Sequence, residues 1–320
     1  MRIGKLDNDE LNELILSKFA KLRDEVVVSP RVGIDCAAVD MGGALCVLST
    51  DPITSATEHI GALTVHVNCN DAAAAGAEPI GLLVTLLVPP SATKEDVARV
   101  ADELSAAARE VNVEIIGGHT EVTASVNRMV TCATVVARAG RNGLVLPSGM
   151  REGDDLVLTK WAGLEGTSVI ASDFAHRLPD FSEEELARAR GFVGRISVLK
   201  EGLFAASFGA HAMHDVTEGG VLGAAWEMAQ ASGCGLTVYP ERVPVHPLTA
   251  KLCAALGLDP LRLLSSGAML IACENGEALA EGLAGIGVEA AVIGKAGGIG
   301  ARLSDGTPLE APGADELYRL

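Results

Sequence analysis

Three aspartates in the first quarter of the chain are suited to a metal and phosphate site. Asp35 lies in the run Gly-Ile-Asp-Cys-Ala-Ala, Asp51 follows an apolar stretch, and Asp71 lies among alanines. Small neighbours would let phosphate groups approach the backbone, and convergent carboxylates can bind Mg²⁺ through oxygen. We therefore predict these three residues as metal ligands. Each alone could be a turn residue, a helix cap or a solvated side chain, so the prediction depends on the set.

Asparagine side chains accompany the third aspartate. Asn68 and Asp71 are three residues apart in a helical pattern, so they share one helix face. Asn68 and Asn70 could add carbonyl oxygens to the site or position a ligating aspartate. We predict Asn68 as a nucleotide-binding residue.

A glycine-rich segment, Gly-Gly-His-Thr-Glu at 117–121, follows an expected short strand. Its backbone could bind an anion or let a nucleotide approach closely, although a plain glycine turn between strands is an alternative. His119 and Glu121 are candidate catalytic groups. Gly117, Gly118 and Thr120 are candidate nucleotide-binding residues.

A second polar run, His-Asp-Val-Thr-Glu-Gly-Gly at 214–220, opens an expected helix. The free amides of a helix N-terminus attract anions, so the run could hold a substrate or a terminal phosphate. An N-cap made by Thr217 or Asp215 is the structural alternative, and both readings can hold together. We assign catalytic roles to His214 and Asp215, and binding roles to the four residues Thr217, Glu218, Gly219 and Gly220.

The elements that would position these groups alternate between helices and strands. The pattern predicts an amphipathic packing helix over 9–23 and a buried strand over 44–50 that Pro52 ends. A helix at 59–76, a strand at 80–88, a capped helix from Thr93 to Val111 and a strand at 130–138 follow. The glycine- and proline-rich stretch 139–154 suggests a boundary near Pro147. We expect two α/β (α+β) domains, residues 1–147 and 148–320.

Composition restricts the partners. Of 320 residues, 48% are hydrophobic and 21% charged, and the net charge of −17 has no basic run to offset it, so we expect neither nucleic acid nor membrane as a partner. Seven cysteines without metal-like spacing, and an N-terminus without an apolar signal segment, favour a cytoplasmic protein. P-loop, dinucleotide and zinc-peptidase motifs do not occur in the sequence.

The order of five motifs resembles that of the aminoimidazole ribonucleotide (AIR) synthetase superfamily, which includes PurM, thiamine monophosphate kinase, selenophosphate synthetase and the hydrogenase maturation protein HypE. The resemblance covers nearly the whole chain. The tract from Gly219 to Leu261 looks most like HypE. The five motifs lie at 33–38, 49–51, 68–79, 117–121 and 214–220.

The resemblance implies a PurM-like two-domain fold in which N-terminal strands of two subunits close a β-barrel and ATP lies near the interface of this homodimer. It also implies ATP and Mg²⁺ as cofactors, with Asp35, Asp51 and Asp71 binding magnesium and phosphates beside Asn68. Members of the family phosphorylate an amide, carbamoyl, formyl or phosphate oxygen. The run 214–220 matches a site that lines the active cleft.

Three departures leave details open. HypE proteins end in a tail with a terminal cysteine, whereas this sequence ends Asp-Glu-Leu-Tyr-Arg-Leu, so we expect no carbamoyl chemistry on its own terminus. The glycine-rich start typical of HypE is replaced by Gly4-Lys5-Leu6, where Lys5 is a candidate phosphate contact. His119 stands where several relatives have Asp, which leaves the number of metals open.

The sequence thus predicts an ATP- and Mg²⁺-dependent enzyme that phosphorylates an oxygen of a small-molecule or peptidic substrate. One alternative is a kinase similar to thiamine monophosphate kinase. The other is a nucleotide-binding homodimer with reduced catalysis that serves a maturation or regulatory partner, including a protein of hydrogenase maturation.

Overall fold

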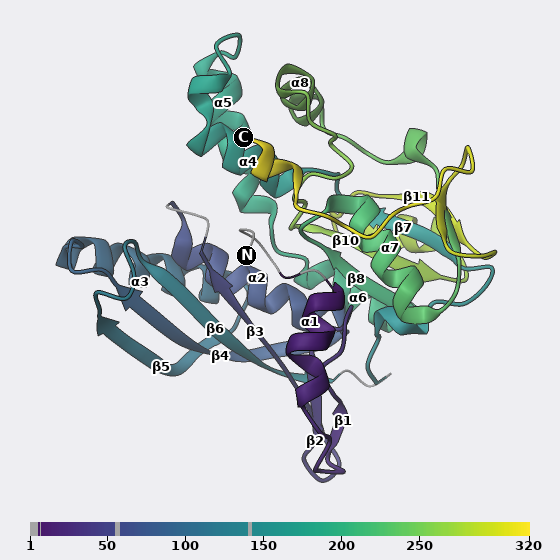
Figure 1. Cartoon of the computed structure of the whole chain (residues 1–320), viewed down its shortest axis with the longest axis horizontal. Helices are drawn as coiled ribbons and strands as arrows, with labels where there is room; N and C mark the ends of the chain where they lie inside the picture. Colours follow the sequence, from purple (N-terminus) through teal and green to yellow (C-terminus); the bar gives the residue numbers. More distant parts are fainter. Residues whose placement is uncertain (1–5, 7, 55–57, 140–142) are drawn as a thin grey trace.

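The structure, a computed structural model, describes residues 6, 8–54, 58–139 and 143–320 (Figure 1). Its strands form two six-stranded sheets, one in each half of the chain. The predicted α/β class, with one sheet in each of two domains, is confirmed. The exact division at Pro147 stays a prediction.

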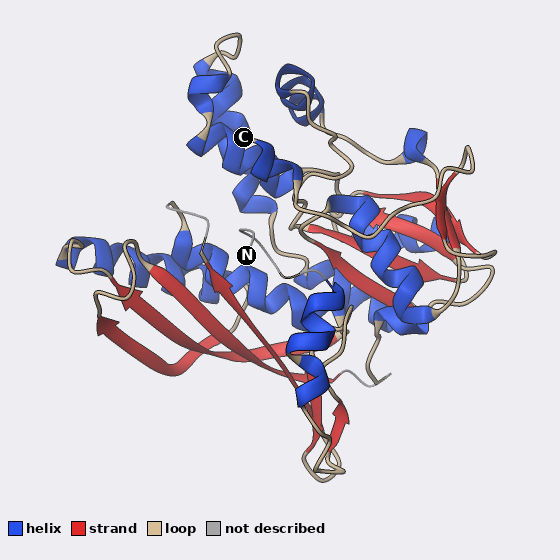
Figure 2. Cartoon of the chain, viewed as in Figure 1, coloured by secondary structure: helices blue, strands red, loops and turns tan. Residues whose placement is uncertain are grey.

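The first domain is one mixed sheet with two long helices on one face, as Figure 2 shows. The strand order is β1-β2-β3-β6-β4-β5, and all neighbours are antiparallel except the parallel pair β4 and β5. The elements are α1 (Asn8–Leu14), β1 (Val26–Val28), β2 (Ala37–Asp40), β3 (Leu45–Ile53), α2 (Ile60–Ala74), β4 (Ala77–Val88), α3 (Lys94–Glu110), β5 (Glu114–Val122) and β6 (Val130–Ala139).

The helix α2 is the centre of this domain. Thirteen of its fifteen residues are buried, because α3, the sheet and the second domain all pack against it. The predicted capping box at the start of α3 is present, with Thr93 accepting from the Asp96 amide and Asp96 accepting from the Thr93 amide. Polar residues of α2 therefore lie in the interior, where they need specific partners.

The first sheet exposes apolar side chains on strand β4 and along its edge strand β5. Every residue of β5 is exposed, although the strand contains isoleucine and valine side chains. The large exposed aliphatic residues of β4 and β5 are Ile80, Leu83, Ile115, Ile116 and Val122. Exposed apolar surface on an open edge strand is typical of a surface that another chain covers.

The half of the chain that contains the second sheet follows the short 3-10 helix at Pro147–Gly149. Its sheet has the order β12-β9-β11-β7-β10-β8. The elements are β7 (Asp155–Thr159), α4 (Leu164–Asp173), α5 (Glu183–Arg190), α6 (Leu199–Phe208), β8 (Ala212–Val216), α7 (Gly220–Ser232), β9 (Leu236–Val238), α8 (Pro247–Leu256), β10 (Ala268–Cys273), α9 (Gly276–Gly285), β11 (Ala290–Ala296) and β12 (Ala301–Leu303), and short 3-10 helices lie at Ala175–Arg177, Gly191–Arg195, Pro240–Arg242 and Glu316–Arg319.

Helices cover both faces of the second sheet, and the alternation of side chains along its central strands explains how both faces are buried. Leu156 and Leu158 of β7 pack in the cluster that contains α7, whereas Val157 packs in the cluster of α6 and α9. Side chains of consecutive strand residues point to opposite faces, so apolar residues at every position bury both faces of this sheet.

The two domains meet where α2 packs against α6 and β8. A side chain at Gly202 of α6 would place its Cβ 2.5 Å from the carbonyl oxygen of Ala73 on α2. Only glycine allows the two helix backbones to approach this closely. Close packing therefore fixes how far α2 and α6 lie from each other.

Two predicted elements are wrong in extent. The helix predicted over 9–23 ends at Leu14 and is followed only by a 3-10 turn at Leu16–Lys18; none of its residues is buried, so no packing stabilises a longer amphipathic helix. The strand that Pro52 was expected to end continues through it to Ile53. Beyond Leu48, β3 pairs with β6 alone among the described strands, and a strand with one free side tolerates proline.

The glycine-rich segment 117–121 is also different from the prediction. It is not a turn that follows a short strand, because β5 continues through it to Val122. Gly118 has φ +147°, and a side chain there would lie 1.8 Å from the Val84 carbonyl oxygen, so glycine lets β5 lie against β4. The glycines thus serve strand pairing.

No helix within the described part of the chain has the length and apolar character needed to cross a membrane.

Candidate active site at the domain interface

Four aspartates from distant parts of the sequence face one another between the domains. Asp71 lies on α2, Asp51 on β3, and Asp35 just before β2, while Asp215 comes from β8 of the second domain. The negative charges of Asp215, Asp51 and Asp35 all act on Asp71. Asp35 and Asp215 also have carboxylate oxygens within 4.8 Å of each other and of a His214 ring nitrogen.

Two neighbours hold these aspartates in place. The Ser49 hydroxyl on β3 lies 2.6 Å from Asp71 Oδ2 and 2.9 Å from the Asp35 carbonyl oxygen. The Asn68 side chain accepts from the Asp51 amide at 2.9 Å and donates to the Asp51 carbonyl oxygen at 3.3 Å. The predicted link between Asn68 and the aspartates is therefore a backbone clamp on Asp51.

Burial and like charges oppose ionisation of the central carboxyl. Asp71 is 4% exposed. Burial, followed by the charges of Asp215, Asp51 and Asp35, raises the pKa of Asp71 well above its ordinary value, and the Ser49 hydrogen bond only partly offsets this. The metal-free site is thus electrostatically unfavourable, and a bound cation would remove the conflict.

His214 lies beside these carboxylates on β8. Its Nδ1 donates to the Asp215 carbonyl oxygen at 2.8 Å, and its Nε2 lies 3.2 Å from Glu227 Oε2, within ion-pair distance but outside hydrogen-bond geometry. Burial lowers the pKa of His214, but Asp215, Glu227 and the charge of Asp35 outweigh it and raise that pKa well above its ordinary value. Both ring nitrogens lie near acceptors, an arrangement that favours the protonated ring.

The residues are of the kind that magnesium prefers. Mg²⁺ binds carboxylate oxygens and usually keeps several waters, and the four aspartates offer such oxygens from two domains. The buried Asp71, whose pKa is raised by its neighbours, has the character of a ligand that needs a cation. Asp35, Asp51, Asp71 and Asp215 would therefore hold the ion.

The N-terminus of α7 is already occupied by the chain's own carboxylate. Gly219 N donates to Asp315 Oδ2 at 2.9 Å, and the Tyr318 hydroxyl donates to Glu218. Burial, followed by the charges of Asp315 and Glu218, raises the pKa of the nearby Glu165 to about 7. The amide of Gly219 can bind a ligand anion only when Asp315 leaves it.

Comparison with known proteins shows the family of this chain. Residues 33–139 match the N-terminal domain of AIR synthase related proteins, and residues 151–301 match their C-terminal domain. The chain belongs to the AIR synthase related family. The family resemblance expected from the five motifs is thereby confirmed.

Relatives within the family include HypE. The chain is 31% identical over 280 residues to carbamoyl dehydratase HypE of Rhizobium leguminosarum bv. viciae, which covers 82% of this chain and 77% of that protein. Among solved structures, E. coli HypE has a TM-score of 0.76 at 24% identity, covering 97% and 99% of the two chains. Thiamine monophosphate kinase from Aquifex aeolicus has a TM-score of 0.74 at 19% identity, covering 97% and 100%. The two structural likenesses show the fold.

The structure of this AIR synthase related chain brings only some of the predicted site residues together. Gly118 of β5 lies in one row with Val84, Ala133 and Asp51 across four adjacent strands. Three strand spacings amount to roughly 14 Å. Among the described residues of one chain, the β5 group lies away from the aspartates: Gly117, Gly118, His119, Thr120 and Glu121.

Within β5, His119 Nε2 lies 3.2 Å from Glu121 Oε2, and both side chains are exposed. Thr217, Glu218 and Gly219 connect β8 to α7, and Gly220 is the first residue of α7, so the expected helix start is present. The binding roles of these residues stay a prediction. Lys5 lies outside the described residues.

Sequence reasoning missed three residues of the site. Ser49 is two residues before Asp51, so strand alternation could have placed both on one face. Glu227 lies on α7 thirteen residues after His214, and Asp315 lies about a hundred residues after Gly219; no sequence spacing signals either contact.

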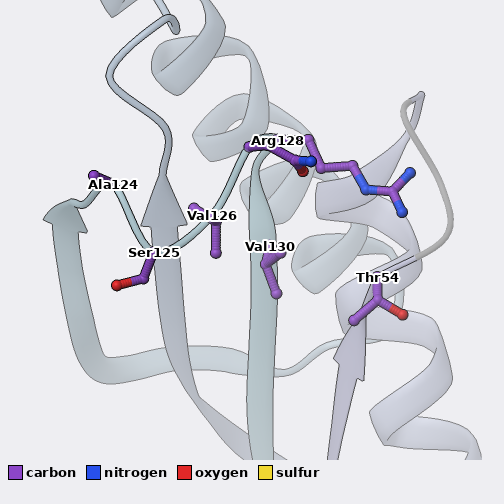
Figure 3. A pocket seen from close by; sticks show the side chains of 7 residues that line it. Thr54, Ala124, Ser125, Val126, Arg128 and Val130 are labelled. Atoms are coloured by element: carbon purple, nitrogen blue, oxygen red, sulfur yellow. The ribbon is translucent and has the colours of Figure 1, made fainter. Parts of the chain in front are cut away.

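A hollow among the described residues lies elsewhere on the first sheet. It has a volume of about 370 Å³ and opens beside Thr54, three residues beyond Asp51, where Arg128 lines it (Figure 3). Arg128 also acts electrostatically on Asp173 of α4, which places this hollow toward the second domain. None of the predicted site residues lines it.

Proposed function

We propose that this protein is an ATP- and Mg²⁺-dependent enzyme of the HypE type that phosphorylates an oxygen of a carbamoyl or amide group. The observation that carries the proposal is the meeting of Asp35, Asp51 and Asp71 with Asp215 across the domain interface. Such a set suits a metal-bound triphosphate and has no evident structural purpose, because like charges in a buried site destabilise the fold.

The relatives support ATP and the acceptor class. Curated relatives from several bacteria are named carbamoyl dehydratase HypE. One similar solved structure is HypE in complex with ATP, and another is the kinase AaThiL with AMPPCP and TMP. A HypE–HypF complex is also similar, so a protein of the maturation type is the partner we propose.

The chain's own residues would bind and orient the reactants. When bound, Mg²⁺ supplies charge neutralisation between carboxylates and phosphate oxygens. Asn68 fixes Asp51 by its backbone, and Ser49 fixes the carboxyl group of Asp71. His214, whose ring lies beside Asp35 and Asp215, would stabilise negative charge on a phosphoryl group bound at these carboxylates.

In the transfer itself, the substrate oxygen attacks the γ-phosphorus of ATP, and the bond from that phosphorus to the bridging oxygen breaks to release ADP. O-phosphorylation with loss of one N–H proton gives a phosphorylated imidate, and loss of the second N–H proton then expels inorganic phosphate and leaves a C≡N bond, so the acceptor loses one water overall. We propose a small or peptidic substrate as the acceptor. Residues 312–318 pack at the start of α7, with Asp315 only 2% exposed.

We further propose a homodimer formed through the first sheet. Its exposed face and the open edge of β5 present aliphatic side chains such as Ile116 and Val122 to solvent. A second copy would cover this surface, and its β5 would bring His119 and Glu121 to the interface, which one chain leaves remote from its own aspartates.

The seven cysteines are all free thiols, which supports a cytoplasmic location.

Replacing Ile116 by Lys should dissociate this dimer, because a charge would be buried at the centre of an apolar interface. We expect the mass in solution, measured by sedimentation, to fall from two chains to one. Ile299→Lys is the matched control, since Ile299 is 93% exposed on a loop of the second domain and should leave the mass unchanged. A wild-type protein that sediments as one chain would refute the dimer.

The enzyme proposal is tested by incubating the protein with Mg²⁺, ATP and three acceptors: a peptide with a carbamoylated cysteine, a simple primary amide, and thiamine monophosphate. We expect ADP release with the carbamoyl peptide, and a mass loss of water from it. ADP release with thiamine monophosphate alone would instead favour the kinase. Binding of Mg·ATP without turnover of any acceptor would favour the nucleotide-binding partner with reduced catalysis.

A further inference from the structure

Asn70 lies on α2, and both the nitrogen and the oxygen of its side-chain amide form hydrogen bonds to the second domain. Its Nδ2 donates to the Ile196 carbonyl oxygen at 2.9 Å, and its Oδ1 accepts from the Val198 amide at 2.8 Å. The side chain is 1% exposed. One donor and one acceptor are thus matched across the domain interface, and this pairing also fixes the orientation of the amide.

Lys160 binds Ser197, the residue between Ile196 and Val198. Its Nζ donates to the carbonyl oxygens of Ser197 and Gly267, both at 2.7 Å, and lies 2.5 Å from Glu201 Oε1. Lys160 and Glu201 are both buried. The side chains of Asn70 and Lys160 therefore bind the backbone of three consecutive residues, Ile196, Ser197 and Val198. We call this contact the 196–198 clasp.

The clasp has an aspartate of the site at each end. Asn70 directly precedes Asp71 on α2. At the other end, Gly267 leads into β10, where Met269 pairs with Asp215 of β8. Asp71 and Asp215 belong to different domains, and the clasp is a hydrogen-bonded connection between the segments that carry them.

Helix packing alone leaves rotation between the domains open. Gly202 and Ala73 set the distance between α6 and α2, but small residues make a smooth contact with few specific interlocks. The two Asn70 hydrogen bonds have strict geometry, and a slipped arrangement would leave buried amide and carbonyl groups unpaired, which is unfavourable. The polar contact therefore selects one orientation.

We propose that Asn70 is a positioning residue that sets the distance between Asp71 and Asp215, and thereby the affinity of the site for Mg·ATP. The inference rests on the proposed function for its ligand. The clasp itself exists in the metal-free protein, so part of the test is independent of that function.

The first measurement is Mg·ATP affinity by titration calorimetry. Asn70→Leu removes both hydrogen bonds, and the isosteric Asn70→Asp removes the donor to Ile196 if the leucine variant does not fold. We expect Mg·ATP affinity to fall by about 10–100-fold, the range typical of residues that orient metal ligands. Thr249→Val is the control, because it removes a buried hydrogen bond to Thr167 within the second domain, and wild-type affinity is expected.

The second measurement is amide hydrogen exchange in the metal-free protein. The Val198 amide should exchange faster in Asn70→Leu than in wild type and Thr249→Val. Affinity equal to wild type in the Asn70 variants would overturn the positioning role, and unchanged exchange at Val198 would overturn the clasp. A wild-type protein that binds no Mg·ATP would overturn the proposed function, while faster exchange would still support the clasp.

Discussion

Asp71→Asn should abolish turnover of Mg·ATP, with a loss of more than about 100-fold in kcat/KM. Orienting residues around a metal typically contribute 10–100-fold, and a direct ligand should contribute more. Asp71 is the most buried of the three predicted N-terminal ligands and feels the charges of the other aspartates. The measurement is ADP release under saturating acceptor, together with Mg·ATP affinity by calorimetry.

The same variant should be more stable than wild type when no metal is present. The folded-state pKa of Asp71 is raised above the unfolded value near 3.8, so the folded state holds the proton more tightly. Stability is therefore lost as pH rises above the unfolded pKa, and asparagine avoids this loss. We expect the melting temperature of Asp71→Asn to exceed that of wild type at pH 8 and to match it near pH 4.

Adding Mg·ATP should reverse the order of the two melting temperatures. Wild type should gain melting temperature with Mg·ATP, because a ligand that binds only the folded state stabilises it, and Asp71→Asn should not. Asp102→Asn, an exposed aspartate on α3, is the control and should behave as wild type. If Asp71→Asn keeps its Mg·ATP affinity, the aspartates do not form the metal site.

Much of the fold followed from local patterns. The α2 and α3 helices, the β4 and β6 strands and the capping box at Thr93 are each determined by residues close together in the sequence. The failures involve long-range contacts. The N-terminal helix is short because none of its described residues is buried, and β5 extends through Gly117–Gly118 because pairing with β4 outweighs the turn preference of glycine.

The candidate site was predictable in part for a similar reason. Three aspartates beside small residues, in an order typical of a family, identified the N-terminal carboxylates. The sequence could not show that Asp215 completes the set, that Asp315 occupies the Gly219 amide, or that β5 lies three strands from Asp51. Those facts depend on how two sheets are ordered and how the domains meet, which spacing does not encode.

Losses from Asp71→Asn and Asp215→Asn should not add. If both carboxylates hold one ion, removing either already empties the site, and the second substitution then has little left to remove. We expect each single variant to lose more than about 100-fold in kcat/KM. The double variant should lose no more than the less active of the two single variants, since groups acting as a unit are non-additive.

A distant aspartate of the second domain provides the comparison. Asp155 binds Lys295 at 2.8 Å and accepts from the Gly276 amide, so Asp155→Asn acts on local stability and not on the metal. In kcat/KM, any small loss from Asp155→Asn should add to the loss from Asp71→Asn, because independent sites contribute additively. Additive losses for Asp71 and Asp215 as well would mean that the two carboxylates serve separate steps, and the shared ion between the domains would be refuted.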